Sequence, residues 1–187
     1  MKFLMAAGAI SALALTLLDN YAAQENPAAR ENIWYTNPIS SQPLALSADG
    51  RVLAVVNPDN NSVSFFDVTD DGNRKLAEVK VQTEPNGVAL SPDRSLAYVA
   101  NTVSGTVTVL RLNRNYDTSE GGFARVVRHI PVGTEPYSLV VSPTGRRLYV
   151  ANSRSNSLSV INARNFRVVK TLDNVGFEPR GLAISND

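Results

Sequence analysis

The stretch LSPDRSLAYVANTVSGTVTVL at residues 90–110 returns as VSPTGRRLYVANSRSNSLSVI at residues 141–161 and, with more changes, as LSADGRVLAVVNPDNNSVSFF at residues 46–66. In each copy an Asn follows the serine by ten residues, and the apolar run ends nine residues after that Asn. A fourth serine, Ser185, begins one more copy, so that the serines are 44, 51 and 43 residues apart. A period of this length with fixed internal offsets indicates repeated supersecondary units.

Each unit carries the alternation of half-buried β-strands. Residues 106–110 read Thr-Val-Thr-Val-Leu, which is the period of two that a strand with one buried face requires. Turn-forming pairs such as Asp49-Gly50 and Thr144-Gly145 separate the runs. We expect four strands per unit, and in the second unit they are predicted at residues 87–90, 96–101, 106–112 and 124–132.

Four short antiparallel strands in a unit of about 40 to 45 residues are typical of one β-propeller blade. The sequence therefore predicts an all-β fold, a β-propeller built from four-stranded antiparallel blades. A β-sandwich also consists of short strands, but it does not explain the fixed offsets. The blades are predicted at residues 41–84, 85–135 and 136–178, followed by a partial blade at 179–187 with an inner strand at 181–185.

Three blades and one inner strand form an incomplete ring, because a closed propeller needs about four blades or more. Residues 24–40 are an N-terminal segment in which Ile33–Thr36 is a candidate ring-closing strand. Two explanations stay open: the chain is the N-terminal part of a longer propeller, or it is a half-ring completed by oligomerisation. The total number of blades does not follow from the sequence.

The first 23 residues have the order of an export signal. Met1-Lys2 precedes an apolar run at residues 3–18, which is shorter than the roughly 20 residues that span a bilayer. Residues 1–23 are therefore predicted to be a signal peptide, with an uncleaved apolar helical anchor as the alternative because Tyr21 fits poorly before a cleavage site at Ala23. We expect a periplasmic, extracellular or cell-surface location, with membrane contact only through an uncleaved N-terminus.

Composition excludes several classes of chemistry. The chain has no Cys and one His, so thiolate metal sites, c-type haem attachment and motifs that need two histidines are absent. With 18 Lys and Arg against 17 Asp and Glu, the net charge of +1 gives no electrostatic footprint for nucleic acid. We expect no metal site, no cofactor and no nucleic-acid partner in this chain.

The repeat resembles a known family. Residues 98–101 (Tyr-Val-Ala-Asn) and 149–152 (Tyr-Val-Ala-Asn), each after a Ser-Pro turn, and the Val132–Pro136 link are similar to the YVTN-type β-propeller repeat of exported bacterial and surface-layer proteins. The resemblance covers about residues 40–187 and implies a ring of about seven blades. Related propellers include lactone hydrolases and the propeller parts of haem- or quinone-dependent dehydrogenases.

The links between blades and the loops between second and third strands lie at one mouth of a propeller channel, where we place the candidate ligand-binding residues. Carboxylates before each link proline could bind a ligand; the alternative is that a Glu before Pro is simply an extended, solvated link residue. An Asn at each second-strand end could contact a ligand, or it could stabilise the following turn. The candidates are Glu84, Glu135, Glu178, Asn57, Asn101, Asn152 and Arg154.

No nucleophile–base set, phosphate loop or dinucleotide fingerprint is present in the sequence. We therefore predict an exported binding or interaction module without catalytic residues in this segment, whose channel face takes a protein, a surface polymer or a small ligand. Two alternatives stay open. One is the propeller portion of a larger enzyme, lactone hydrolase-like or haem/quinone dehydrogenase-like, with its active residues elsewhere. The other is a structural protein of the cell surface.

Overall fold

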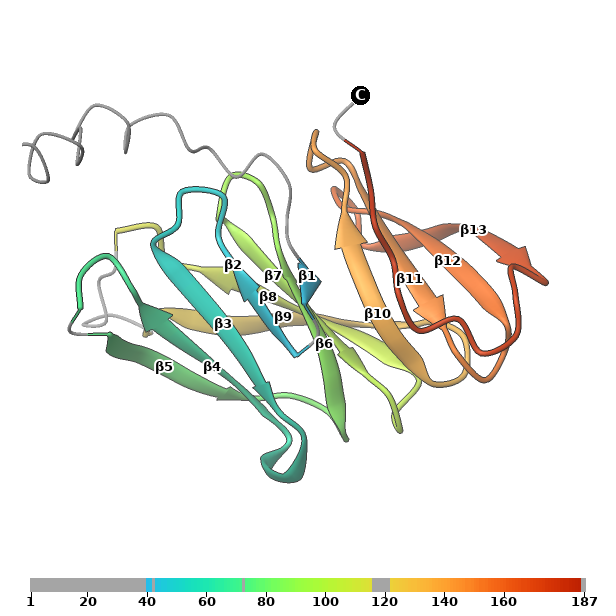
Figure 1. Cartoon of the computed structure of the whole chain (residues 1–187), viewed down its shortest axis with the longest axis horizontal. Coiled ribbons are helices and arrows are strands. Elements are labelled where there is room, and N and C mark those ends of the chain that lie inside the picture. The colour runs from blue at the N-terminus through green and yellow to red at the C-terminus, as the bar shows by residue number, and fades with distance from the viewer. Residues whose placement is uncertain (1–39, 42, 72, 116–121, 186–187) are drawn as a thin grey trace, which may run out of the picture. The chain divides into compact units, whose positions relative to one another are not determined.

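The computed structural model describes residues 40–41, 43–71, 73–115 and 122–185. They form three antiparallel sheets in chain order (Figure 1), which confirms the all-β prediction and the incomplete propeller. The predicted signal peptide (residues 1–23), most of segment 24–40, including Ile33–Thr36, and the last two residues lie outside this described part. Among the described residues, no helix has the length and apolar character needed to cross a membrane.

The first sheet has five strands, and one 3₁₀ turn, η2 (Pro58–Asn60), joins its third and fourth. Its strands are β1 (Ser40–Ser41), β2 (Leu44–Leu46), β3 (Val52–Asn57), β4 (Ser62–Asp67) and β5 (Arg74–Lys80). The short strand β1, which pairs with β2, was not predicted. It has only two residues, too few to show an alternating pattern.

The second and third sheets have four strands each, in sequential order. The second consists of β6 (Pro85–Leu90), β7 (Leu96–Asn101), β8 (Thr106–Leu112) and β9 (Ala124–Pro131). The third consists of β10 (Pro136–Val141), β11 (Arg147–Asn152), β12 (Ser157–Asn162) and β13 (Arg167–Asp173). Strands β7 and β8 coincide with the predicted strands 96–101 and 106–112, because turns bound both runs and β8 alternates polar with apolar residues.

The predicted inner strand at residues 181–185 is wrong for this structure. These residues form no ladder with any described strand. A strand is defined by its paired neighbour, and in the other blades the inner strand pairs with the second strand of its own blade, as β6 pairs with β7. An apolar stretch without that partner stays outside a sheet.

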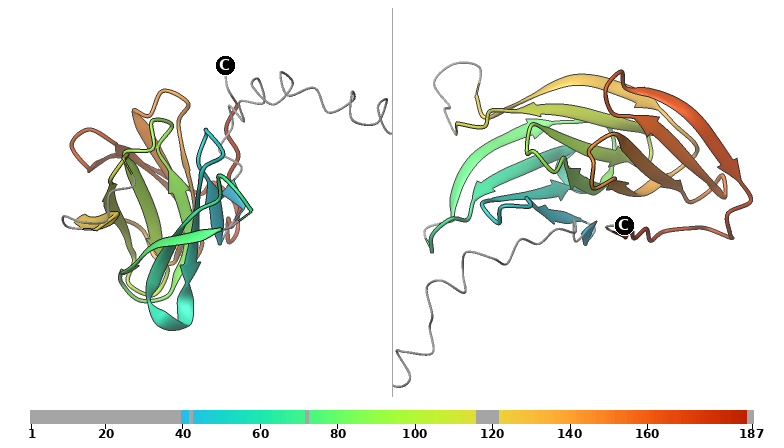
Figure 2. Two further views of the ribbon diagram at one scale, coloured as in Figure 1. Left: turned by 90° about the vertical axis from the view of Figure 1, so that its left-hand side faces the viewer. Right: turned by 90° about the horizontal axis from the view of Figure 1, so that it is seen from above.

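The core lies between the sheets rather than within any one of them. One apolar cluster joins the first and second sheets and includes Val63, Phe65, Val99 and Phe123; a second joins the second and third. The rings of Phe65 and Phe123 lie 5.6 Å apart across the first of these interfaces. Figure 2 shows the three sheets fanned one after another, so that the middle sheet has both faces covered.

A salt bridge ties the first two blades at the end of the sheets where the first and second strands turn. Arg94 Nη1 lies 2.6 Å from Asp49 Oδ2 of the preceding blade. Arg94 has φ 55°, at the place where the matching turns carry Gly50 and Gly145 with φ of 70° and 67°. A non-glycine residue in this region costs free energy, and the interblade ion pair offsets part of that cost.

At the same end, a small cavity of about 230 Å³ lies between the Ser91–Ser95 turn and residues 144–145 of the next blade. Tyr98 lines it, is fully buried, and its hydroxyl has no hydrogen-bond partner among the described residues. Burial raises the pKa of Tyr98 to about 12, with a smaller contribution from the Asp93 carboxylate.

Removing the aromatic contact between the first two blades should strongly destabilise the chain. Phe65→Ala deletes a fully buried ring and should lower the free energy of unfolding by about 3–5 kcal/mol. Phe177→Ala is the matched control, because that ring is 86% exposed. Urea denaturation of the full chain checks both; equal effects of the two variants would contradict an interblade core.

The shifted pKa of Tyr98 makes stability fall at high pH. Its folded pKa of about 12 lies above the ordinary value of 10.0, so the folded state keeps a proton that the unfolded state loses between these values. The contribution is complete below pH 10 and is lost as pH rises toward 12. We expect Tyr98→Phe to flatten this decline in denaturation series at pH 9 to 11.5, and an unchanged decline in this variant would contradict the assignment to Tyr98.

Candidate functional site

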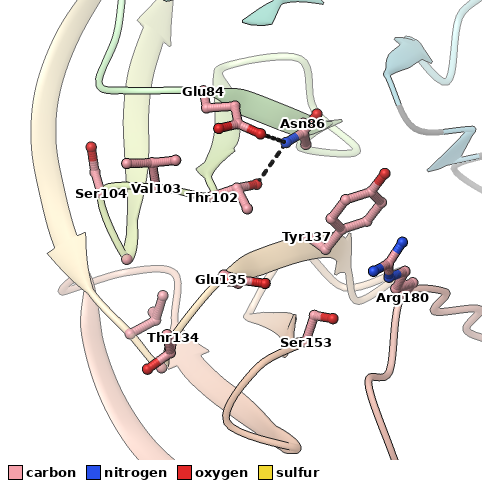
Figure 3. Close-up of a pocket in the computed structure, with 13 residues that line it drawn as sticks. Glu84, Asn86, Thr102, Val103, Ser104, Thr134, Glu135, Tyr137, Ser153 and Arg180 are labelled. Carbon is pink, nitrogen blue, oxygen red and sulfur yellow. Dashed lines mark hydrogen bonds between the residues drawn. The ribbon is translucent and has the colours of Figure 1, made fainter.

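A cavity of about 600 Å³ opens at the other end of the sheets, between the second and third blades. It lies where the predicted channel mouth is, since the interblade links and the loops between second and third strands line it (Figure 3). Two of the three predicted link carboxylates, Glu84 and Glu135, belong to its lining, together with polar side chains that the sequence analysis did not select.

Two positions that carry amide side chains in the first blade and its link are glycines beside this cavity. The residue directly before each third strand has positive φ: it is Asn61 in the first blade, Gly105 in the second and Asn156 in the third. In the links, Gly133 takes the place of Gln82. Gly105 and Gly133 both line the cavity. The missing side chain at Gly105 leaves space there, because a Cβ would meet only the carbonyl oxygen of Gly133, at 3.6 Å, whereas a Cβ at Gly133 would collide with Asn152.

The link glutamates do not have the extended backbone that was expected if they were simple solvated link residues. Glu84, Glu135 and Glu178 have φ of 56°, 53° and 45°, in the left-handed region. Backbone hydrogen bonds hold the first two: the amide nitrogens of Thr102 and Ser153 donate to the carbonyl oxygens of Glu84 and Glu135 at 2.9 and 2.8 Å. These bonds outweigh the extended preference of a residue before proline.

The second-blade side of the cavity is a connected set of polar groups. Asn86 Nδ2 donates to Thr102 Oγ1 at 2.9 Å and lies 3.4 Å from Glu84 Oε1. Thr102 Oγ1 in turn donates to the carbonyl of Pro136 in the third blade, at 2.9 Å. These bonds fix the orientation of Asn86, which projects toward the cavity in Figure 3.

The third-blade side contains an unsatisfied hydroxyl. Ser153 lines the cavity and is 2% exposed, yet its Oγ has no hydrogen-bond partner among the described residues. Ser153 follows Asn152 as Thr102 follows Asn101, but it lacks the equivalent bond. A buried hydroxyl without a partner costs free energy, and a ligand oxygen in the cavity would satisfy it.

An aromatic and a cationic side chain complete this side. The Arg180 guanidinium lies 5.4 Å from the centre of the Tyr137 ring, over its face, an arrangement that stabilises the cation. Arg180 also lies 3.6 Å from Glu178. The predicted site residue Arg154 pairs with the same carboxylate at 3.4 Å, and neither Arg154 nor Glu178 lines the cavity.

The three predicted asparagines serve the sheets instead of the cavity. Asn101 and Asn152 are fully buried, and each donates from Nδ2 to two hydroxyls on the third strand of its own blade. Asn57 makes the same pair of bonds to Ser62 and Ser64, both at 3.0 Å. None of the three lines the cavity. The asparagines therefore stabilise the hairpin between the second and third strands, and they do so mainly through bonds to side-chain hydroxyls of the third strand.

Three of the lining residues that the sequence did not predict occupy one position of the repeat. Asn86, Tyr137 and Arg180 each follow a link proline directly, and all three line the cavity. The flanking Glu-Pro is constant while this position changes between blades. Variation at one place in an otherwise regular repeat could have revealed them, because recognition uses differences between blades.

The described residues contain no group of three or more potential metal ligands. The single histidine, His129, lies on β9 with its Nδ1 3.0 Å from Thr108 Oγ1, and it is absent from the cavity lining. The arrangement thus offers carboxylates, hydroxyls, amides and one guanidinium, a set that suits a small ligand rich in oxygen.

Comparison with known proteins supports a family assignment. The model of the Lactonase, 7-bladed beta-propeller family matches residues 15–132. A search of curated proteins found no match.

Solved structures share the fold. The periplasmic gluconolactonase PpgL of Pseudomonas aeruginosa is 26% identical with a TM-score of 0.60, covering 77% of this chain and 42% of its own. Hydrazine synthase of Kuenenia stuttgartiensis is 29% identical with a TM-score of 0.63, covering 72% and 36%. A putative 6-phosphogluconolactonase of Bacteroides fragilis is 20% identical with a TM-score of 0.63, covering 73% and 39%. The chain thus spans about two fifths of the length of these structures.

The close approach at Gly133 predicts a steric effect at the cavity wall. A Cβ there would lie 2.6 Å from Asn152 Cγ and 2.7 Å from its Cβ. Gly133→Ala should therefore destabilise the chain by about 1–3 kcal/mol. Gly181→Ala is the control, since a Cβ at Gly181 meets no atom within 4 Å. Thermal unfolding of both variants checks this, and an unchanged midpoint for Gly133→Ala would contradict the packing described.

Proposed function

The chain belongs to the Lactonase, 7-bladed beta-propeller family, and we propose that its cavity between the second and third blades binds a sugar lactone and promotes its hydrolysis. The observation that carries the proposal is the meeting of two carboxylates, Glu84 and Glu135, with the unsatisfied buried hydroxyl of Ser153 in one cavity. The 26% identical PpgL is described as a gluconolactonase, which supports this substrate class.

The polar lining suits the hydroxyl groups of a sugar ring. Asn86, Thr102 and Ser153 supply amide and hydroxyl groups, and Tyr137 supplies an aromatic face. A volume of about 600 Å³ lies within the range of small-molecule sites. The family assignment and the chemistry of the lining thus support the same kind of ligand.

Hydrolysis would need one of the carboxylates as a general base. The base takes a proton from water, the water oxygen bonds to the lactone carbonyl carbon, and the ring C–O bond breaks. The proton then passes to the departing ring oxygen, which gives the open hydroxy acid. We assign the base to Glu135, because no hydrogen bond to its carboxylate is present among the described residues, whereas Glu84 is held by Asn86.

The cellular location forms part of the same proposal. The apolar run at residues 3–18 has the order of an export signal, and PpgL is described as periplasmic. We propose that the protein acts in the periplasm on a lactone present there. The YVTN-type character of the repeat stays a prediction from the sequence.

A second candidate is a binding module without turnover. It is favoured by the position of His129, which leaves the described cavity lining without an imidazole. In this case the cavity binds a sugar lactone or its hydroxy acid and releases it unchanged.

Replacing the proposed base separates these functions. Glu135→Gln should lower the rate of D-glucono-1,5-lactone hydrolysis, corrected for the spontaneous reaction, by about 10²-fold or more, while D-gluconate still binds. Asp59→Asn, an exposed carboxylate on the same face and outside the cavity, is the matched control. Hydrolysis is followed by acid release at constant pH. Binding without any turnover by the unaltered chain would support the binding module and refute the hydrolase.

A further inference from the structure

The backbone amide nitrogens of the three link glutamates do not all have the same hydrogen-bond partner. Glu84 N donates to Asn61 Oδ1, and Glu178 N donates to Asn156 Oδ1, both at 2.8 Å. We call such a link closed, because this hydrogen bond joins it to the turn directly before the third strand, and the Asn is its closing residue. Both bonds use the side chain of a residue with φ near 50°, so the hairpin turn and the link are one structural unit in the first and third blades.

The second blade lacks this closure. Gly105 stands at the position of Asn61 and Asn156, with φ of 63°, and has no amide group to offer. Within the described residues no acceptor bonds Glu135 N, although the neighbouring Thr134 N still donates to Ser155 Oγ at 3.1 Å. The backbone around Glu135 is otherwise the same, since its φ of 53° and its carbonyl bond to Ser153 N match those of Glu84.

We infer that a ligand oxygen takes the place of the missing amide oxygen and accepts the hydrogen bond of Glu135 N. The position is defined by the two closed links, where an amide oxygen lies 2.8 Å from the glutamate nitrogen. Because Gly105 and Glu135 both line the cavity, an oxygen there belongs to whatever fills it. The inference rests on the proposed function for the identity of the ligand.

The ligand group that fits is a carbonyl or carboxylate oxygen. It must accept a hydrogen bond from a backbone N–H as an Asn amide oxygen does, and a lactone carbonyl meets this requirement. During hydrolysis that oxygen gains negative charge, which an N–H donor stabilises. Glu135 would thus contribute its backbone nitrogen to the carbonyl oxygen and its side chain to the attacking water.

The neighbouring blades supply the variant that tests this. Gly105→Asn restores the closing residue of the first and third blades, and Asn tolerates positive φ better than most residues. A Cβ at Gly105 meets only the carbonyl oxygen of Gly133, at 3.6 Å, an ordinary contact. The new amide should bond Glu135 N and occupy the place of the ligand oxygen. Gly50→Asn is the matched control, because it places the same side chain on another glycine with positive φ, at the opposite end of the sheets and outside the cavity lining.

Two measurements are made on the full chain. Amide hydrogen exchange by NMR should show that Glu135 N–H exchanges faster than Glu84 and Glu178 in the unaltered chain and becomes protected in Gly105→Asn. Turnover of D-glucono-1,5-lactone should fall about 10²-fold in Gly105→Asn, the size of a lost oxyanion donor, and should stay within about threefold in Gly50→Asn. D-Gluconate should shift the Glu135 amide resonance of the unaltered chain.

The possible failures are distinguishable. If Gly105→Asn protects Glu135 N–H and turnover is unchanged, the inference is overturned while the proposed function stands. If Glu135 N–H is not protected in this variant, the assignment of Gly105 as the missing closing residue is wrong. If the unaltered chain neither hydrolyses the lactone nor shows gluconate-induced shifts, the proposed function fails and the ligand assigned to this position fails with it.

Discussion

The structure depends on one constraint: a four-stranded blade cannot bury its faces alone, and each blade needs a neighbour. The clusters between successive sheets meet this need with Phe65 and Phe123 at one interface and Tyr98 and Leu139 at the other. Because the interface is shared, the links that join the blades are held in fixed positions at the channel mouth. Polar groups of two blades can therefore line one cavity, as Asn86 and Ser153 do.

The cavity arises from small departures from the repeat. The first and third blades close their links with Asn61 and Asn156, and the second blade has Gly105 instead. Gly133 then brings the link close to Asn152 without a side chain of its own. The changes leave the strands unaltered, since β8 runs from Thr106 in the same register to β7 as β12 does to β11. A repeat can thus gain a cavity by losing one side chain while its core stays intact.

The sequence predicts the fold well because its signals are local. Turn residues bound β7 and β8, alternation marks β8 as a strand, and the fixed serine-to-asparagine offset identifies the blade. The site is harder to predict because it depends on contacts between residues far apart in the chain. Glu84 and Glu135 were selected from their place before a proline, but their left-handed backbone follows from bonds to Thr102 and Ser153. Asn57, Asn101 and Asn152 were selected for their regularity, and that regularity reflects a shared role within the sheets. The strand predicted at residues 181–185 shows the same limit, because an apolar run becomes a strand only beside a partner.

A crystal structure of the full chain with D-gluconate tests the central claim most directly. We expect gluconate in the cavity between the second and third blades, with one carboxylate oxygen within hydrogen-bonding distance of Glu135 N and a hydroxyl near Ser153 Oγ. Gluconate bound at another place, or a cavity that stays empty at saturating gluconate, would show that this cavity is not the ligand site.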